Sequence, residues 1–210
     1  MPRVPRPPRI LDAMRVIAGT AKGTRLGRAP AGVRPVSDRV REGLFSSIGP
    51  WIEGSRVLDL YAGTGAVGIE ALSRGAEHAT FVDSSPSAVA AVRDNLRRAG
   101  FEGRSAVRRS NVRTFVERTD GPGFDLVFLD PPYETGPSDL DPVLAALDLS
   151  SLLRGGFTVI LSRGSKSSNG VIPLHWEAAR RLSYGDSLVT LFRARIPPGT
   201  PGDMPGNLEV

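Results

Sequence analysis

The chain of 210 residues contains no cysteine, which excludes a disulfide framework, a thiolate zinc site and a cysteine nucleophile. Histidine is also scarce. His78 and His175 are the two that are present, and they lie too far apart in the sequence to form a metal-ligand pattern. We therefore interpret both as surface or packing residues and expect no metal centre.

Long apolar runs are missing as well. No stretch approaches the ~20 residues that a membrane-spanning helix needs. The first ten residues, MPRVPRPPRI, are basic and proline-rich but lack the apolar segment of a signal peptide. We therefore expect a cytoplasmic protein with no membrane partner, and we expect a monomer.

Positive charge is concentrated in the first quarter of the chain. Residues 1–50 hold ten basic and three acidic residues, whereas the remaining 160 hold seventeen and nineteen. A GC-rich genome would explain why all but two of the 27 basic residues are arginine, but it would not explain this clustering. A basic segment attached to a near-neutral body indicates contact with a polyanion.

The chain is long enough for one α/β domain and a small appendage. We predict a disordered leader over 1–13, an N-terminal β-hairpin and helix over 14–50, a catalytic domain over 51–196 and a disordered tail over 197–210. The hairpin strands are expected at 15–19 and 22–26. The helix should begin at Ser37 or Asp38 and continue through Ile48, with Arg39 and Arg41 off its apolar stripe.

Strands and helices alternate from residue 56 onward. Strands are expected at 56–61, 79–83, 104–108, 124–129 and 157–162, and helices at 66–74, 86–99, 111–118 and 139–148. Two further strands, 174–183 and 187–195, would form an antiparallel hairpin at the sheet edge. The predicted fold class is α/β, Rossmann-like, with a mostly parallel, seven-stranded, doubly wound sheet and a small N-terminal β appendage.

A glycine-rich loop follows the first of these strands, in Val57-Leu58-Asp59-Leu60-Tyr61-Ala62-Gly63-Thr64-Gly65-Ala66-Val67-Gly68. Glycines there let the backbone approach a ligand, and the next helix offers free N–H groups. The loop also matches the dinucleotide fingerprint, so it leaves NAD and S-adenosylmethionine both open. Asp83, at the end of the next strand, would hydrogen-bond ribose hydroxyls in either case.

Asp59 favours S-adenosylmethionine. Its carboxylate lies at the base of the loop, four residues before Gly63. It would repel a pyrophosphate in a partly desolvated site but attract the cationic amino and sulfonium groups of S-adenosylmethionine.

A second motif, Asp130-Pro131-Pro132-Tyr133, ends the strand over 124–129. Consecutive prolines cannot extend a sheet ladder, and they hold the backbone stiffly. An exocyclic amine of a nucleobase has two hydrogens, which the Asp130 carboxylate and the Pro131 carbonyl are suited to accept. Tyr133 can stack on the base. The chemistry would be an in-line displacement that depends on positioning and needs no metal.

Together these motifs resemble those of class I amino-methyltransferases, and a closer resemblance covers residues 14 to about 195. The segments 14–19, 22–26, 34–45, 58–75 and 130–133 resemble the RsmD family in order, and the stretch from Arg34 to Phe45 is the most specific. That family methylates N2 of a guanine in 16S ribosomal RNA, in the loop of helix 31. It acts on the 30S subunit or its assembly intermediate.

The resemblance implies a role for each matching position. S-adenosylmethionine, released as S-adenosylhomocysteine, would be bound by Asp59, Tyr61, Gly63, Thr64, Gly65, Asp83, Ser84, Asn111, Val112 and Asp130. The guanine would be held by Asp130, Pro131, Pro132 and Tyr133. The ribosomal RNA would face Arg15, Lys22, Arg25, Arg34, Arg39 and Arg41.

The sequence departs from the family pattern at two places. After the fifth strand the family often has an acidic residue where this chain has Ser162-Arg163, so a polar contact near the base is absent or replaced. The second strand ends in Asp83 rather than the usual Glu, which is shorter by one methylene and should still reach the ribose.

Other functions remain as alternatives. An adenine-N6 methyltransferase acting on DNA or RNA would use the same acceptor geometry, although the DNA enzymes normally carry a target-recognition domain. A protein-glutamine methyltransferase would resemble Asn-Pro-Pro-Tyr rather than the motif at Asp130. An NAD-dependent oxidoreductase would need an acid or base for hydride transfer, and a non-catalytic RNA-binding module would not need the motif.

Overall fold

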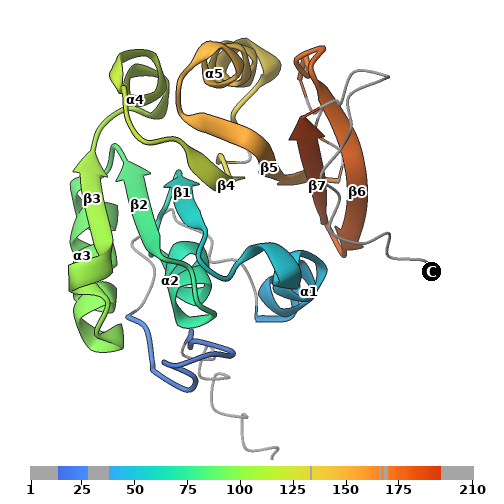
Figure 1. The fold of residues 1–210 in the computed structure, drawn as a ribbon. Coiled ribbons are helices and arrows are strands. Elements are labelled where there is room, and N and C mark those ends of the chain that lie inside the picture. Colours follow the sequence, from blue (N-terminus) through green and yellow to red (C-terminus); the bar gives the residue numbers. More distant parts are fainter. Residues whose placement is uncertain (1–13, 28–37, 133, 166, 168–169, 195–210) are drawn as a thin grey trace, which may run out of the picture.

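Seven strands form one sheet in the order β3-β2-β1-β4-β5-β7-β6 (Figure 1). The computed structural model describes residues 14–27, 38–132, 134–165, 167 and 170–194. The predicted leader and tail lie outside these residues, as do Arg34 and Tyr133. The strands are β1 (Arg56–Leu60), β2 (His78–Asp83), β3 (Ser105–Arg109), β4 (Phe124–Leu129), β5 (Leu153–Gly164), β6 (Trp176–Tyr184) and β7 (Ser187–Ala194).

Strands β1 to β5 are parallel, and β7 lies antiparallel between β5 and β6. The antiparallel edge hairpin is therefore confirmed. Because β6 runs opposite to β7, it is parallel to β5 and ends at the same edge of the sheet. The turn between β6 and β7 thus returns the chain to the carboxyl ends of the parallel strands.

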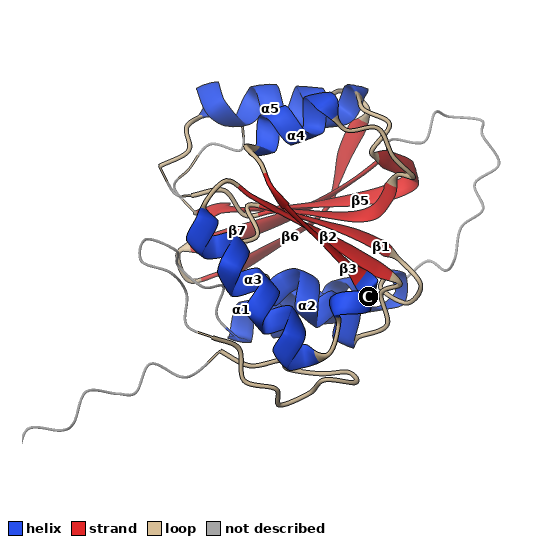
Figure 2. Cartoon of the chain, turned by 90° about the vertical axis from the view of Figure 1, so that its left-hand side faces the viewer, coloured by secondary structure: helices blue, strands red, loops and turns tan. Residues whose placement is uncertain are grey.

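Helices cover both faces of the sheet (Figure 2). One face carries α1 (Asp38–Ile48), α2 (Ala66–Ser73) and α3 (Pro86–Ala99), and the other carries α4 (Val112–Arg118) and α5 (Pro137–Leu149). Each face has its own apolar core, because successive strand residues point to opposite sides. Two short 3-10 turns, Gly49–Trp51 and Glu102–Arg104, complete the described elements. The predicted Rossmann-like, doubly wound fold is confirmed.

The N-terminal hairpin is shorter than predicted. The strands expected at 15–19 and 22–26 are reduced to one antiparallel bridge between Arg15 and Arg25. Backbone hydrogen bonds from Val16 N to Thr24 O (3.0 Å) and from Leu26 N to Met14 O (2.7 Å) flank that bridge. The segment packs on α2 instead of extending as a ribbon (Figure 1). At Gly19 (φ +83°) a Cβ would lie only 1.8 Å from the Ser73 carbonyl oxygen.

A buried charged cluster attaches this segment to the body. Both carboxylate oxygens of Glu70, in α2, accept backbone N–H groups, from Ile17 (2.8 Å) and Ala18 (3.0 Å). Arg74 donates to the same carboxylate through Nε (2.7 Å). Arg41 of α1 places Nη1 3.8 Å from Glu70 Oε2, and neither of these two side chains is exposed.

The prediction that Arg41 contacts RNA is therefore wrong. Its side chain is fully buried, and Nη2 donates to the Arg15 carbonyl (2.8 Å) and to Asp38 (2.5 Å). The reason is helical periodicity. Residue 41 precedes Leu44, Phe45 and Ile48 by three, four and seven positions, so it shares their buried stripe.

Candidate active site

A cavity of about 780 Å³ opens at the carboxyl ends of the parallel strands. β1 contributes Asp59, β2 contributes Asp83, β5 contributes Ser162, and Asp130 directly follows β4. This edge is where ligands bind in open α/β sheets. The volume suffices for a nucleoside-sized ligand together with part of a second molecule.

Most of the predicted site residues line this one cavity: Asp59, Tyr61, Gly63, Thr64, Asp83, Ser84, Asn111, Asp130, Pro131 and Pro132. Two predicted cofactor residues do not form its wall. Gly65 is buried as the N-cap of α2, and Val112 packs into the core at the start of α4. Tyr133 lies outside the described residues.

The glycine-rich loop is held in shape by side chains from its neighbours. Asp83 accepts the Gly63 N–H through Oδ2 and the Ser85 N–H through Oδ1, each at 2.9 Å. Asn95 of α3 donates to the Thr64 carbonyl (2.9 Å). Gly65 adopts φ +74° to start α2, and a Cβ at Gly68 would lie 2.4 Å from the Phe81 ring. The loop is therefore preorganised, with its backbone facing the cavity.

Asp59 is a buried carboxyl at the base of this loop, with 3% of its surface exposed. Burial raises its pKa to about 8, the Gly68 N–H (3.0 Å from Oδ2) opposes that rise, and the nearby charges of Asp130 and Asp83 add to it. A buried acid without a cationic partner is costly in its charged form. A ligand that brings positive charge to this corner would restore the ionised form.

Asp130 stands at the end of β4, the strand beside β1. Burial raises its pKa, and a hydrogen bond with the Ser162 side chain lowers it. Ser162 is thus one of the two residues that stand where the family pattern has an acid, and both lie within β5 rather than after it. The other, Arg163, is 5% exposed and donates through Nη2 to the Thr135 carbonyl (2.7 Å), which fixes the segment after the motif.

The far wall of the cavity contains residues that no sequence motif marks. Tyr184, Asp186 and Ser187 line it from the turn between β6 and β7, opposite the cofactor loop. The local pattern there indicated only a turn. The strand order contains the information that places this turn. The first strand of the final hairpin, β6, runs parallel to β5, so the turn that follows it lies at the edge of the sheet where ligands bind.

Four other basic residues of the predicted RNA face belong to the described part of the chain and are exposed. Arg15, Lys22, Arg25 and Arg39 all have accessible side chains, and Arg15 lies 3.6 Å from Asp38. All four belong to the N-terminal hairpin and α1. Within the described ranges, no helix is long and apolar enough to cross a membrane, and no group of three or more His, Asp or Glu could hold a metal ion.

The strand order, the antiparallel β7 and the glycine-rich loop after β1 define the fold of class I S-adenosylmethionine-dependent methyltransferases. The model of the family described as conserved hypothetical protein 95 matches residues 14–193, and the chain belongs to that family. The resemblance to the RsmD family is confirmed by its curated relatives.

Three relatives illustrate the match. A Bacillus subtilis protein, YlbH, named provisionally as an rRNA methyltransferase, is 41% identical over 186 residues, which cover 87% of this chain and 100% of that protein. Ribosomal RNA small subunit methyltransferase D of Escherichia coli is 30% identical over 181 residues, covering 86% and 89%. The solved structure of yhhF from Escherichia coli superposes with a TM-score of 0.75 at 30% identity, covering 87% and 98%.

Proposed function

We propose that this protein transfers a methyl group from S-adenosylmethionine to the exocyclic N2 of a guanine in 16S ribosomal RNA. The observation that carries the proposal is that the acid at the base of the glycine-rich loop and the acid of the Asp-Pro-Pro motif line one cavity from adjacent strands. The part of the cavity around Asp59 suits a cationic methyl donor, and the part around Asp130 suits an amine.

The cofactor half fits S-adenosylmethionine in charge and shape. That molecule supplies a methyl group on a positively charged sulfur. The buried Asp59 carboxyl suits such a cation and would disfavour a pyrophosphate. Asp83 already accepts two backbone N–H groups, and each of its oxygens retains a lone pair for a ribose hydroxyl. Asn111 caps α4 by accepting the Thr114 N–H (3.2 Å), which leaves its amide hydrogens for an adenine.

The acceptor half fits an exocyclic amine. The Asp130 carboxylate and the Pro131 carbonyl would accept the two N–H groups, so that the nitrogen lone pair points toward the cofactor half. The N–C bond forms as the S–C bond breaks, and the nitrogen then releases one proton. Because burial raises its pKa, Asp130 is suited to take that proton.

The choice of ribosomal RNA rests on the family and on the basic N-terminal segment. Relatives that match most of this chain are named for small-subunit ribosomal RNA methylation. The exposed Arg15, Lys22, Arg25 and Arg39 would bind phosphates beside the cavity. We take the partner to be 16S ribosomal RNA in the 30S subunit or its assembly intermediate, and the active enzyme to be a cytoplasmic monomer.

The decisive experiment maps the methylated nucleotide. Small subunits from a strain that lacks this gene would be incubated with the purified protein and S-adenosylmethionine carrying a labelled methyl group. The expected product is one N2-methylguanine in 16S ribosomal RNA, located by nuclease digestion and mass spectrometry. Label in N6-methyladenine, or binding of NAD but not S-adenosylmethionine in calorimetry, would overturn the proposal.

A further inference from the structure

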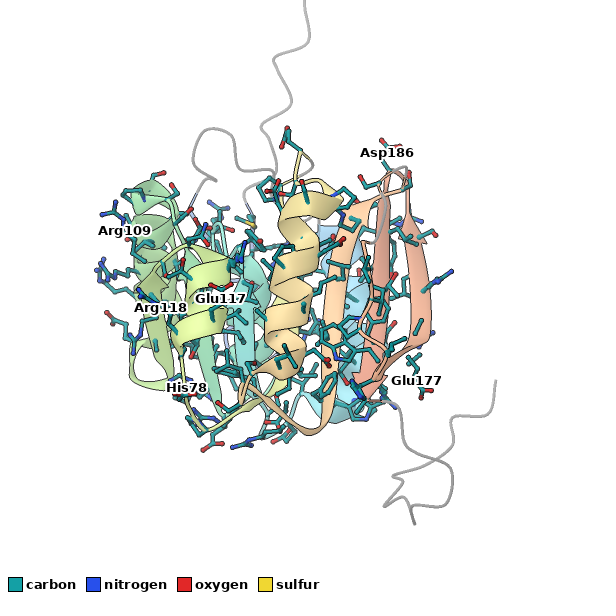
Figure 3. The ribbon with its side chains drawn as sticks, turned by 90° about the horizontal axis from the view of Figure 1, so that it is seen from above. His78, Arg109, Glu117, Arg118, Glu177 and Asp186 are labelled. Atoms are coloured by element: carbon teal, nitrogen blue, oxygen red, sulfur yellow. The ribbon has the colours of Figure 1, made fainter. Side chains whose placement is uncertain are left out.

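The turn between β6 and β7 places a carboxylate on the acceptor side of the cavity. Asp186 lines the cavity, and Figure 3 shows it at the edge of the sheet opposite His78 and Glu177. His78 begins β2 and Glu177 lies near the start of β6, so Asp186 lies where the parallel strands end. The chemistry proposed above uses no residue of this turn.

The sheet order sets the separation of Asp186 from the amine-binding acid. Asp130 follows β4, and β5 lies between β4 and β7. Two strand spacings amount to about 10 Å across the sheet, and the register places Asp186 three residues, or about 10 Å, farther along the strands than Asp130. The two backbones are therefore about 14 Å apart, and when both carboxylates reach inward the remaining gap of roughly 7 Å accommodates the hydrogen-bonding edge of one base. The cofactor loop is on the opposite side of Asp130, after β1, so the base ring would extend from Asp130 toward the turn.

The turn itself is held firmly. The Asp186 carbonyl accepts the Ser165 N–H at 2.7 Å, and Ser187 pairs with Gly164 of β5. Gly185 supplies the positive φ (+56°) that a two-residue hairpin turn requires. Tyr184 packs against α1, where a Cβ on Gly43 would lie 2.0 Å from its hydroxyl oxygen. These contacts fix the backbone of the turn, and with it the point from which the exposed Asp186 side chain projects.

Guanine and adenine differ at the atom next to the amine-bearing carbon. N1 of guanine carries a hydrogen, whereas N1 of adenine and N3 of cytosine are bare acceptors. A carboxylate accepts hydrogen bonds and cannot donate one. It therefore attracts the N1–H of guanine and repels the bare N1 of adenine and the bare N3 of cytosine. We propose that Asp186 accepts the N1–H of the target guanine and thereby selects guanine over adenine and cytosine. This inference rests on the proposed function and explains how that site would choose its base.

The other acids that line the cavity in the described part of the chain lie on other segments. Asp59 and Asp83 hold the cofactor loop through hydrogen bonds to its backbone. Asp139, in the first turn of α5, lies near Tyr61, whose pKa is raised by burial and then by the charge of Asp139. Glu134 lies on the segment that follows the Asp-Pro-Pro motif. Of the acids that line the cavity, Asp186 alone is placed beyond β5, on the far side of Asp130 from the cofactor loop.

The test compares two acceptors that differ at N1. Small subunits would be reconstituted with 16S ribosomal RNA carrying either guanine or 2-aminopurine at the mapped position. 2-Aminopurine keeps the exocyclic amine but has a bare N1 and lacks O6, so the change of preference caused by Asp186→Asn isolates the contact at N1. The wild-type enzyme, Asp186→Asn and the matched control Glu177→Gln, whose exposed carboxylate lies at the other end of β6, would each be assayed for kcat/KM on both acceptors.

We expect wild type and Glu177→Gln to prefer guanine over 2-aminopurine by about 10–100-fold, the worth of a hydrogen bond to a charged group. Asp186→Asn should lower that preference by at least tenfold, with S-adenosylmethionine affinity unchanged. Equal wild-type rates on both acceptors would overturn the inference and leave the proposed function intact, as would an Asp186→Asn variant that loses the same factor on both. No wild-type transfer to the guanine subunits would overturn both.

Discussion

Arg41 and Glu70 form a fully buried ion pair, with 3.8 Å between Nη1 and Oε2, that joins α1 to α2 beneath the N-terminal hairpin. Glu70 also accepts the N–H groups of Ile17 and Ala18, and Arg41 donates to the Arg15 carbonyl. The pair therefore fixes the basic segment to the helix that follows the cofactor loop. In the proposed function, the pair would position the basic segment that contacts RNA without contacting RNA itself.

Replacing Glu70 by Gln should destabilise the protein by about 3–5 kcal/mol, because it removes the fully buried one of the two carboxylates beside Arg41 and replaces one acceptor oxygen of the cluster by an amide group. Urea unfolding measures this as a lower midpoint, and hydrogen exchange at the Ile17 and Ala18 amides should accelerate. Glu42→Gln, the same change at the exposed residue next to Arg41, serves as the control and should move the midpoint little. Equal unfolding midpoints for both variants would show that Glu70 does not stabilise the attachment of the N-terminal hairpin.

Arg39 is exposed on the same helix and should behave in the opposite way. Arg39→Ala is expected to leave the unfolding midpoint near wild type but to weaken binding to 16S ribosomal RNA. The slope of log K against log salt should fall by about one, the value for one lost phosphate contact. Fluorescence anisotropy over a salt series measures this slope. An unchanged slope would show that Arg39 lies outside the RNA footprint.

Asp130→Ala should separate binding from transfer. The acceptor would lose one of its two hydrogen-bond partners, and we expect kcat to fall by at least about 100-fold. Affinity for S-adenosylmethionine, measured by calorimetry, should stay within about threefold of wild type, because Asp59 and the loop remain intact. A parallel loss of binding and transfer would mean that Asp130 mainly supports the structure.

The raised pKa of Asp59 leads us to expect that cofactor binding depends on pH. Its pKa in the folded protein, about 8, is raised, so the folded state retains a proton that the unfolded state loses. Stability without ligand should therefore decrease as pH rises from about 4 to about 8. A cationic ligand needs the ionised form, so its affinity should rise with pH up to about 8.

The measurement is the ratio of S-adenosylmethionine affinities of wild type and Asp59→Asn between pH 6.5 and 8.5. Taking the ratio removes the titration of the cofactor's own amino group. The ratio should grow with pH by up to about tenfold per unit and then level off. A ratio that stays flat across this range would contradict a direct contact between Asp59 and the cation.

Gly43→Ala tests whether the packing of α1 against Tyr184 positions the far wall of the cavity. The new Cβ would overlap the Tyr184 hydroxyl, so that ring must move, while the helix gains about 1 kcal/mol in propensity. We expect near-normal stability and cofactor binding but a roughly tenfold lower kcat/KM for small subunits. Gly49→Ala, which adds a methyl group in open space, is the control. Normal transfer by Gly43→Ala would show that the position of Tyr184 is unimportant.

Most of the fold could be predicted because its signals are local. Nearly continuous apolar runs such as Phe124–Leu129 mark strands buried on both faces, and that strand was predicted with its exact bounds. Strand β5 is longer than expected, since it begins at Leu153, which pairs with Phe124 before the register shifts to Thr158, and Leu153 to Gly156 carry no apolar pattern. The hairpin at 14–27 was overestimated because its stability comes from α2 rather than from strand pairing.

The residues of the candidate site likewise include some that local sequence motifs identify and some that they do not. Asp59, Asp83 and Asp130 each end or follow a strand and could be found from sequence motifs. Asp186 could not, because its place depends on β7 entering the sheet between β5 and β6. Arg41 was misassigned because its charge was given more weight than its position on the helix, although its spacing to Leu44 and Phe45 indicated burial.

The insertion of β7 also has an evolutionary consequence. In the proposed function, most of the donor-binding segments precede residue 112, whereas the acceptor wall is closed by the terminal hairpin. Substitutions in that hairpin would then change which molecule is modified without disturbing the parts that hold the methyl source. A lineage with this arrangement can acquire new targets through mutations in a short stretch near its carboxyl end.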